Sequence, residues 1–361
     1  EISPTYAKLT EKLMNNSMVG GQINNKLLFS ATIKEITHED DAPLKKMQSV
    51  YSYVQQHMQW NGYDQVIPDV SLNKAHRVAT GTNAEINLLL VNMLRTAGIP
   101  ADPVVLSTRE NGRINTFVAI ANNIDYLICI ANINGKDYLL DATDKFRPAG
   151  MLPFKCLNIE GWVLSPTRGR WVKLLNEESY TTREHYDLKL NSNGEFEGHA
   201  VISFSGYDAV DLRRLLYNEG EEGFREEVFA EAGNLTISNM VFQHTDSLES
   251  PLRLTFNVKF RHLLQKADQM VFFRPMISLF GDYVNSWVKD ERNFPIDRGC
   301  PTFDSLTCIL HLPDNYLVEE LPKSAKILLP NQEAKFELGN TYSNNVLTIT
   351  SNLTVSKTRF E

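Results

Sequence analysis

The stretch that most constrains the fold is ATGTNAEINLLLVNMLRTAGIPADPVVL, which spans residues 79–106. Residues 84–100 predict a helix with apolar residues on most of its sides, and such a helix must be buried. Gly98 suits the position just after the last helical turn, and Pro100 prevents the helix from continuing. Residues 101–108 then predict a buried strand. The stretch therefore predicts the centre of a folded core.

Length and composition indicate a folded protein with two domains. The chain has 361 residues, of which 42% are hydrophobic and 22% are charged, as in globular proteins. A net charge of -8 argues against a nucleic-acid partner, because no basic face offsets it. The longest apolar run, residues 86–94, contains two asparagines and is far too short to span a bilayer. We therefore expect no transmembrane segment.

The cysteines and histidines suggest neither a metal site nor a cofactor. The four cysteines form no CxxC pair and no zinc-type cluster with histidine; they are Cys129, Cys156, Cys300 and Cys308. A bridge between the last two stays open, since spacing alone cannot decide it. The chain begins with Glu1 and shows no signal peptide. We expect a fragment or a processed product, with a removed signal, lipid anchor or upstream domain left open.

The first half of the chain predicts helices followed by antiparallel strands. Residues 4–15 and 38–60 have helical periodicity, and the second helix has Asp41 as a candidate cap and Pro43 near its first turn. Residues 124–143 predict a hairpin, because two β-rich runs flank Asn134-Gly135. This order is typical of an α+β fold. We expect one domain over residues 1–175, with N-terminal helices in 1–60 and a core in 61–175.

The second half predicts a β-rich domain over residues 176–361, with the boundary inside 174–184. Residues 183–206 predict a long hairpin around Asn193-Gly194, and two helical pieces follow. Further strands are expected in four segments: 252–260, 305–313, 334–340 and 345–356. Many short strands separated by turn signals favour an antiparallel β-sandwich with inserted helices.

Three sequence blocks resemble the transglutaminase-like superfamily of papain-like proteins. They are GTNAEINLLLVNMLRTAGIPADPVVLSTRENG (81–112), IDYLICIANINGKDYLLDAT (124–143) and AGMLPFKCLNIEGW (149–162), in the family's order. The third block is similar to a loop found in bacterial envelope members. Residues 293–322 are similar to the β-rich domain that follows the core in those proteins. The resemblance implies a papain-like or transglutaminase-like core followed by a β-rich domain.

The resemblance also identifies three positions that carry a Cys-His-Asp triad in catalytic members. In such a triad a helix N-terminus and an imidazolium lower the thiol pKa, and an aspartate orients the histidine. The three positions hold Asn83, Tyr126 and Asp141 in this chain. Asn83 has no thiol, and a tyrosine with a pKa near 10 is a poor base at neutral pH. We therefore lean towards a protein without this chemistry.

No other residue replaces the missing nucleophile by sequence pattern. Cys129 follows Tyr126 by three residues on one expected strand, so the two should face opposite sides of the sheet. Cys156 lies in the expected loop, with no activating neighbour in sequence. His57 and His76 flank the expected site in sequence, and neither belongs to a recognisable motif.

Two interpretations of the substituted site stay open. Asn83 could cap the helix beside a hydrogen-bonded Tyr126 and Asp141, and the three residues could serve only to stabilise the core. They could instead line a cleft that binds a ligand, with Trp60 at its border or buried in the core.

The leading functional expectation is a catalytically degenerate protein with a binding or scaffolding role. The resemblance places it in the periplasm or on the surface of a bacterium, with an unidentified peptide, glycan or protein as partner. One alternative is an active thiol peptidase, amidase or acyltransferase with an unidentified nucleophile. Another is a purely structural module of a larger protein.

Overall fold

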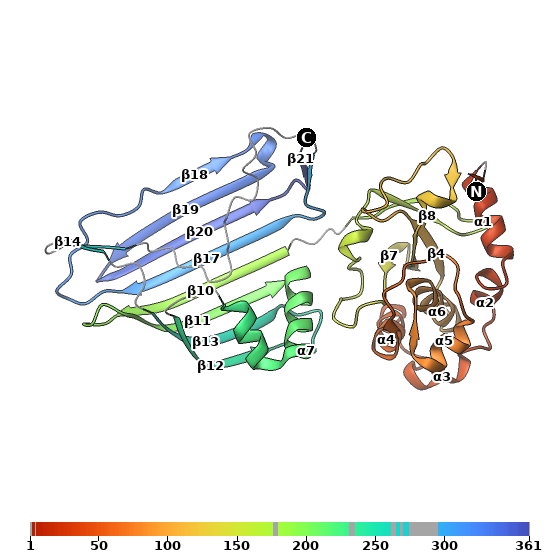
Figure 1. Cartoon of the computed structure of the whole chain (residues 1–361), viewed down its shortest axis with the longest axis horizontal. Coiled ribbons are helices and arrows are strands. Elements are labelled where there is room, and N and C mark those ends of the chain that lie inside the picture. The colour runs from red at the N-terminus through yellow and green to blue at the C-terminus, as the bar shows by residue number, and fades with distance from the viewer. Residues whose placement is uncertain are drawn as a thin grey trace. The chain divides into compact units, whose positions relative to one another are not determined.

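The computed structural model describes residues 2–3, 5–175, 180–230, 235–260, 265–267, 270–273 and 295–360. The chain divides into two compact units, Glu1–Asn176 and Glu177–Glu361. Each unit has its own apolar core, and Figure 1 shows the elements of both.

The first unit is built around the helix that the sequence predicts to be buried. This helix, α6 (Asn83–Thr96), packs against four other helices and three strands, and every residue from 83 to 94 is buried. The other helices are α1 (Tyr6–Asn15), α2 (Gly20–Ile23), α3 (Ser30–Ile36), α4 (Pro43–His57) and α5 (Leu72–Val78). The expected central helix is confirmed, because only a site enclosed on all sides can bury so many apolar side chains.

A five-stranded antiparallel sheet completes this unit, in the order β7-β6-β4-β8-β9. Its strands are β4 (Ala101–Leu106), β6 (Tyr126–Ile133), β7 (Lys136–Leu140), β8 (Glu160–Val163) and β9 (Trp171–Lys173). Asn134 and Gly135 join β6 to β7 with φ of 53° and 84°, which confirms the expected hairpin. Two short pairs add β1 (Ile2–Ser3) to β5 (Ala119–Ile120), and β2 (Gln59–Trp60) to β3 (Thr80–Gly81).

The start of α4 differs from expectation. Its cap position is Ala42, and no side chain caps the helix there. The Asp41 carboxylate instead accepts hydrogen bonds from the His38 backbone N–H at 2.9 Å and from the Lys45 ammonium at 2.5 Å. These bonds hold Asp41 on the loop that precedes the helix, so its predicted capping role is wrong.

The second unit contains one eight-stranded sheet in the order β12-β13-β11-β10-β17-β20-β19-β18 (Figure 1). Its strands are β10 (Tyr180–Leu190), β11 (Phe196–Ser205), β12 (Leu235–Gln243), β13 (Leu252–Phe260), β17 (Thr302–His311), β18 (Ala325–Leu328), β19 (Ala334–Ser343) and β20 (Val346–Val355). Two short pairs accompany it: β14 (Gln265–Ala267) with β15 (Met270–Phe272), and β16 (Ile296–Asp297) with β21 (Arg359–Phe360).

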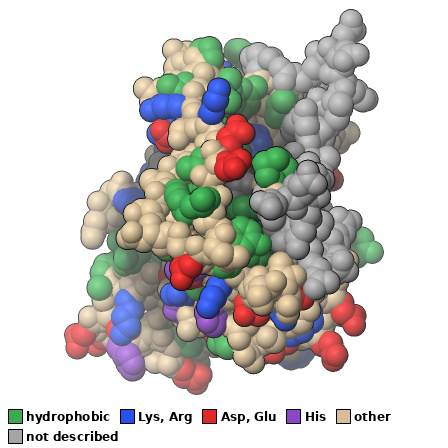
Figure 2. All heavy atoms as spheres, turned by 90° about the vertical axis from the view of Figure 1, so that its left-hand side faces the viewer, with side chains coloured by type: hydrophobic (Ala, Val, Ile, Leu, Met, Phe, Trp, Pro, Cys, Tyr) green, Lys and Arg blue, Asp and Glu red, His purple; other side chains and the backbone are tan. Residues whose placement is uncertain are grey.

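The α+β class and a β-rich second unit are confirmed, but the strands are arranged differently from a sandwich. Within the described residues, the parallel pair β10–β17 joins two antiparallel halves edge to edge, so that they form one sheet. Helix α7 (Tyr207–Val228) packs against β11 and bends at Gly220, where φ is 69°. The bend separates the two helical pieces that the sequence predicts. On the face in Figure 2, acidic and basic side chains are interspersed with apolar ones.

All four cysteines are buried and none forms a disulfide, so the possible bridge between Cys300 and Cys308 is not formed. Among the helices of the described residues, none combines the length and apolar character needed to cross a bilayer.

Candidate functional site

The loop that leads into α6 is fixed by a buried carboxylate. Thr82 is the cap residue, and its backbone N–H donates to Glu85 at 2.8 Å. Glu85 also accepts from the backbone N–H of Asp69 at 2.6 Å. Gly81 leaves space for the Glu85 side chain, because a Cβ at position 81 would lie only 2.9 Å from the Glu85 Cβ. Asn83 is therefore the first residue of the helix, and its expected role as the cap is wrong.

Asn83, which the resemblance places at the nucleophile position, is fully buried. Its Oδ1 accepts from the Gln65 backbone N–H at 2.6 Å, and its Nδ2 donates to the Leu127 carbonyl at 3.2 Å. The side chain thus ties the loop before α5 to strand β6. Both ends of the amide are used in holding the backbone.

Tyr126 and Asp141 are in direct contact and are also fully buried. The Tyr126 hydroxyl donates to Asp141 Oδ2 at 2.9 Å. Burial, together with the negative charge of Asp141, raises the Tyr126 pKa well above its usual value. Tyr126 therefore stays protonated and acts as a hydrogen-bond donor to the aspartate.

Asn87 connects these residues to Asn83, which lies one turn earlier on α6. Its Nδ2 lies 2.9 Å from Asp141 Oδ2 and 3.0 Å from the Leu127 carbonyl, which Asn83 also contacts. Its Oδ1 accepts from the Ala142 N–H at 3.0 Å. The sequence signal for Asn87 was available: it is a polar residue in a mostly apolar helix, one turn after Asn83 and on the same side.

Arg147 balances the charge of Asp141. Its guanidinium donates to Asp141 Oδ1 at 2.9 Å and to Asp144 at 3.2 Å. Burial alone would lower the Arg147 pKa, but the two aspartates outweigh it and raise this pKa. Asp141 Oδ1 also accepts from the Thr143 N–H at 3.1 Å. The Asp141 carboxylate is therefore paired with a cation and surrounded by hydrogen-bond donors.

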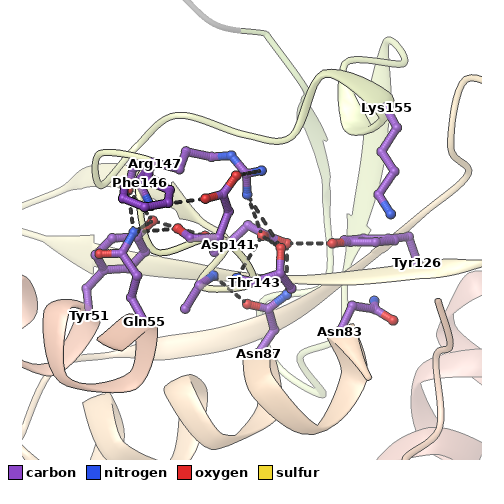
Figure 3. A network of polar contacts seen from close by, with 12 residues as sticks. Tyr51, Gln55, Asn83, Asn87, Tyr126, Asp141, Thr143, Phe146, Arg147 and Lys155 are labelled. Atoms are coloured by element: carbon purple, nitrogen blue, oxygen red, sulfur yellow. Dashed lines mark hydrogen bonds and ion pairs between the residues drawn. The ribbon is translucent and has the colours of Figure 1, made fainter. Parts of the chain in front are cut away.

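Helix α4 holds the loop that carries Arg147 (Figure 3). The Tyr51 hydroxyl lies 3.0 Å from the Asp141 carbonyl and 3.1 Å from the Arg147 carbonyl. Gln55 donates to the Arg147 carbonyl at 2.6 Å and to the Asp144 carbonyl at 2.7 Å. The network thus joins α4, α6, β6 and the loop after β7.

A second set of contacts lies over the Tyr126 ring. Lys155 Nζ is 4.7 Å from the centroid of this ring and 4.3 Å from that of Trp60. The same ammonium lies 2.6 and 2.9 Å from the two carboxylate oxygens of Asp64. In the view of Figure 3, Lys155 lies above the Tyr126 ring and Asn83 lies below it. Trp60 is half-buried, and its indole N–H donates to the Tyr63 carbonyl at 3.0 Å.

The cysteines near the site are protonated. Cys129 packs in the apolar core with residues of α6, and burial raises its thiol pKa. Cys156 is fully buried too, and burial and the charge of Asp141 raise its pKa well above the usual range. A thiolate is the nucleophilic form of cysteine, so neither residue is activated.

His57 and His76 form a separate cluster between α4 and α5. Their rings stack with centroids 4.3 Å apart, and His57 Nε2 lies 2.8 Å from the His76 carbonyl. The Tyr53 hydroxyl lies 2.8 Å from His76 Nε2. These bonds occupy both imidazoles within the helical layer. Across the described residues, no group of three or more His, Cys, Asp or Glu side chains is arranged to hold a metal ion.

Comparison with known proteins finds one match in the first unit and one in the second. Residues 30–138 match the model of the transglutaminase-like superfamily, and residues 269–361 match a domain of unknown function with a solved structure (DUF3858). No curated protein matches the chain. A crystal structure from Parabacteroides distasonis, described as a "putative protease", aligns with a TM-score of 0.54 and 12% identity.

That alignment covers 98% of this chain and 52% of the other one, so this chain spans about half of that protein's length. At such low identity the likeness shows a shared fold, and activity has to be argued from the site. The chain carries a transglutaminase-like superfamily domain, followed by a β-rich domain.

Proposed function

We propose that the protein is a catalytically degenerate transglutaminase-like protein with a binding or scaffolding role. The observation that carries the proposal is the state of the two substituted positions. Asn83 and Tyr126 are fully buried, and their polar atoms are engaged in hydrogen bonds within the protein.

The chemistry of the site argues in the same direction. The Asn83 amide has no thiol with which to form an acyl-enzyme intermediate. Tyr126, with its raised pKa, cannot act as a base at neutral pH. Asp141 keeps the contact that would orient a histidine, but its donors include Arg147, which makes it part of an ion pair. The retained set therefore supports the fold around the former catalytic position.

An active thiol enzyme is the alternative, favoured by the description of the structural neighbour as a "putative protease". Cys156 is its best candidate nucleophile, since it directly follows Lys155, whose ammonium lies 4.7 Å from the centroid of the Tyr126 ring. Burial of the thiol and the charge of Asp141 both disfavour the thiolate, so the geometry supports the degenerate protein better.

The proposed location is the periplasm or cell surface of a bacterium, and the partner would be a peptide, a glycan or a protein. This part of the proposal rests on the resemblance of residues 149–162 to envelope proteins of the family. A purely structural role in a larger protein is a further alternative.

An activity assay tests the proposal directly. The protein is incubated with a thiol-directed activity probe, and separately with an amine donor and a glutamine-containing acceptor. We expect no labelling and no transfer above the level of a heat-unfolded control. Catalytic labelling of the native protein, or transfer in the second assay, would overturn the degenerate interpretation.

Restoring the missing residues tests the placement of the site. We expect Asn83→Cys combined with Tyr126→His to create a reactive thiolate, because Asp141 would then orient a histidine beside a thiol at a helix N-terminus. Neither single change should do so, and Asn92→Cys on the same buried helix is the matched control. Iodoacetamide labelling at position 83 itself is measured by peptide mapping, with and without Lys155→Met, which removes the cation above residue 126. A folded double variant that stays inert in both backgrounds would contradict the placement.

A further inference from the structure

A binding role at this site meets one obstacle. Asn83, Tyr126 and Asp141 have no exposed surface in the closed structure. A ligand can reach them only if a covering segment moves. The segment in question is residues 153–157, here named the strap, which contains a short 3-10 turn at Phe154–Cys156.

We propose that the strap is a gate that closes the degenerate site, and that Lys155 is the latch that holds it shut. The inference deepens the proposed function, on which it rests for the identity of the site. It adds that access to Tyr126 and the residues beneath it is controlled by release of one ammonium group.

The latch is a compact cage for the Lys155 ammonium. Two aromatic faces, from Trp60 and Tyr126, lie 4.3 and 4.7 Å from Nζ, and both Asp64 oxygens lie within 2.9 Å. Aromatic faces and a carboxylate are the groups that attract an ammonium ion. Trp60 ends strand β2 and Asp64 lies in the loop that follows it, whereas Tyr126 begins strand β6. One side chain therefore connects the strap to two separate segments at the rim of the site.

Arg109 holds the backbone of the strap independently of the Lys155 ammonium. The Arg109 backbone N–H donates to the Lys155 carbonyl at 2.8 Å, and its guanidinium donates to the Leu157 carbonyl at 3.1 Å. Within the strap, the Cys156 N–H donates to the Pro153 carbonyl at 2.8 Å. The Arg109 bonds attach the strap to the loop after β4. Opening breaks the bond to the Lys155 carbonyl and keeps the guanidinium bond to the Leu157 carbonyl, so the strap swings on its Leu157 end.

The strap also carries its own reporter. Cys156 follows the latch residue directly and is fully buried, and the negative charge of Asp141 contributes to its raised pKa. Opening of the strap brings this thiol into solvent. Cys129 is equally buried, but it lies in the apolar core on β6 and becomes accessible only when the core opens. Comparing the two thiols separates a local opening from unfolding of the whole unit.

The test measures the labelling rate of Cys156 in the folded protein with a small thiol reagent, and peptide mass mapping identifies the site. We expect Lys155→Met and Asp64→Asn each to accelerate labelling of Cys156 by at least about tenfold. Labelling of Cys129 should stay at the native rate. The matched controls are Arg170→Met and Asp137→Asn, which break another ion pair at the surface of the same unit and should leave Cys156 unaffected.

Two results would overturn the gate. One is labelling of Cys156 at the native rate in both latch variants. The other is a parallel acceleration at Cys129, which would show that the variants loosen the whole core. The labelling rate depends on no ligand and no activity. Its failure therefore removes the gate alone, while the activity assay above decides on degeneracy.

Discussion

Two ion pairs of the first unit have similar chemistry and very different surroundings. Arg147 and Asp141 meet at 2.9 Å in the interior, where the aspartate side chain is 0% exposed. Lys155 and Asp64 meet at 2.6 Å at the rim, where both side chains are more than a quarter exposed. The inner pair holds together α4, α6 and the loop after β7, whereas the outer pair holds one strap against the site.

The difference bears on the proposed degeneracy, because the inner pair has a structural role that needs no reaction. Asp141 neutralises Arg147 and accepts hydrogen bonds from Tyr126 and Asn87. A buried ion that loses its partner is very unfavourable, so none of these residues changes freely. The outer pair is close to water, where ion pairs contribute little to stability. We therefore expect the inner pair to determine folding and the outer pair to determine access.

The largest effect should follow from breaking the inner pair. Arg147→Met leaves the Asp141 carboxylate buried without its cation, which costs about 3–5 kcal/mol of the free energy of unfolding. Lys155→Met should cost at most about 1 kcal/mol, because its partner remains in contact with water. Urea unfolding of both variants measures the difference. Equal losses of unfolding free energy in the two variants would show that burial does not make the inner pair more important for stability than the outer pair.

A smaller effect is expected for Tyr126→Phe, which removes one donor from Asp141 and preserves the ring under Lys155. The carboxylate keeps Arg147, Asn87 and the Thr143 N–H, so the loss should be about 1–2 kcal/mol. The same urea titration places this variant between Arg147→Met and Lys155→Met. Labelling of Cys156 should stay slow in it, because the aromatic face of the cage is retained. Fast labelling would show that the hydroxyl, rather than the ring, holds the strap.

Much of the first unit could be predicted because its signals are local. The burial of α6 follows from its apolar residues, and Asn134-Gly135 marks its hairpin directly. The cap was misplaced by one residue, since Thr82 and Asn83 are both cap-forming types. The Glu85 side chain, three residues after Thr82, distinguishes them, because a capping box needs this spacing.

The contacts that define the site could not be predicted, because they join segments far apart in the chain. Lys155 meets Asp64 across 91 residues, and Gln55 meets the Arg147 carbonyl across 92. No spacing rule connects such positions. The single sheet of the second unit depends in the same way on β10 pairing with β17, whose residues are more than a hundred positions apart. Alternation along each strand indicates its buried side, but not its neighbour.

The smallest expected effect is a change in the pKa of Asp64, the acidic partner of the outer pair. The Asp64 pKa is raised overall, mainly because the carboxyl is partly buried, and the charges of Asp125 and Asp141 add to the rise. The hydrogen bond and the positive charge of Lys155 act in the opposite direction and lower this pKa. Lys155→Met should therefore raise this pKa further, as measured by NMR of the carboxyl carbon against pH. Because the folded pKa already exceeds the unfolded one, Asp64 favours folding most at low pH. This contribution of Asp64 to the free energy of unfolding is lost as pH rises through the folded pKa. Lys155→Met should lose more of it, because its folded pKa lies further above the unfolded one.

Arg170→Met is the control and should leave the Asp64 pKa unchanged. An unchanged pKa in Lys155→Met would mean that the ammonium does not occupy the cage in solution, and the outer pair would then have no role in holding the strap.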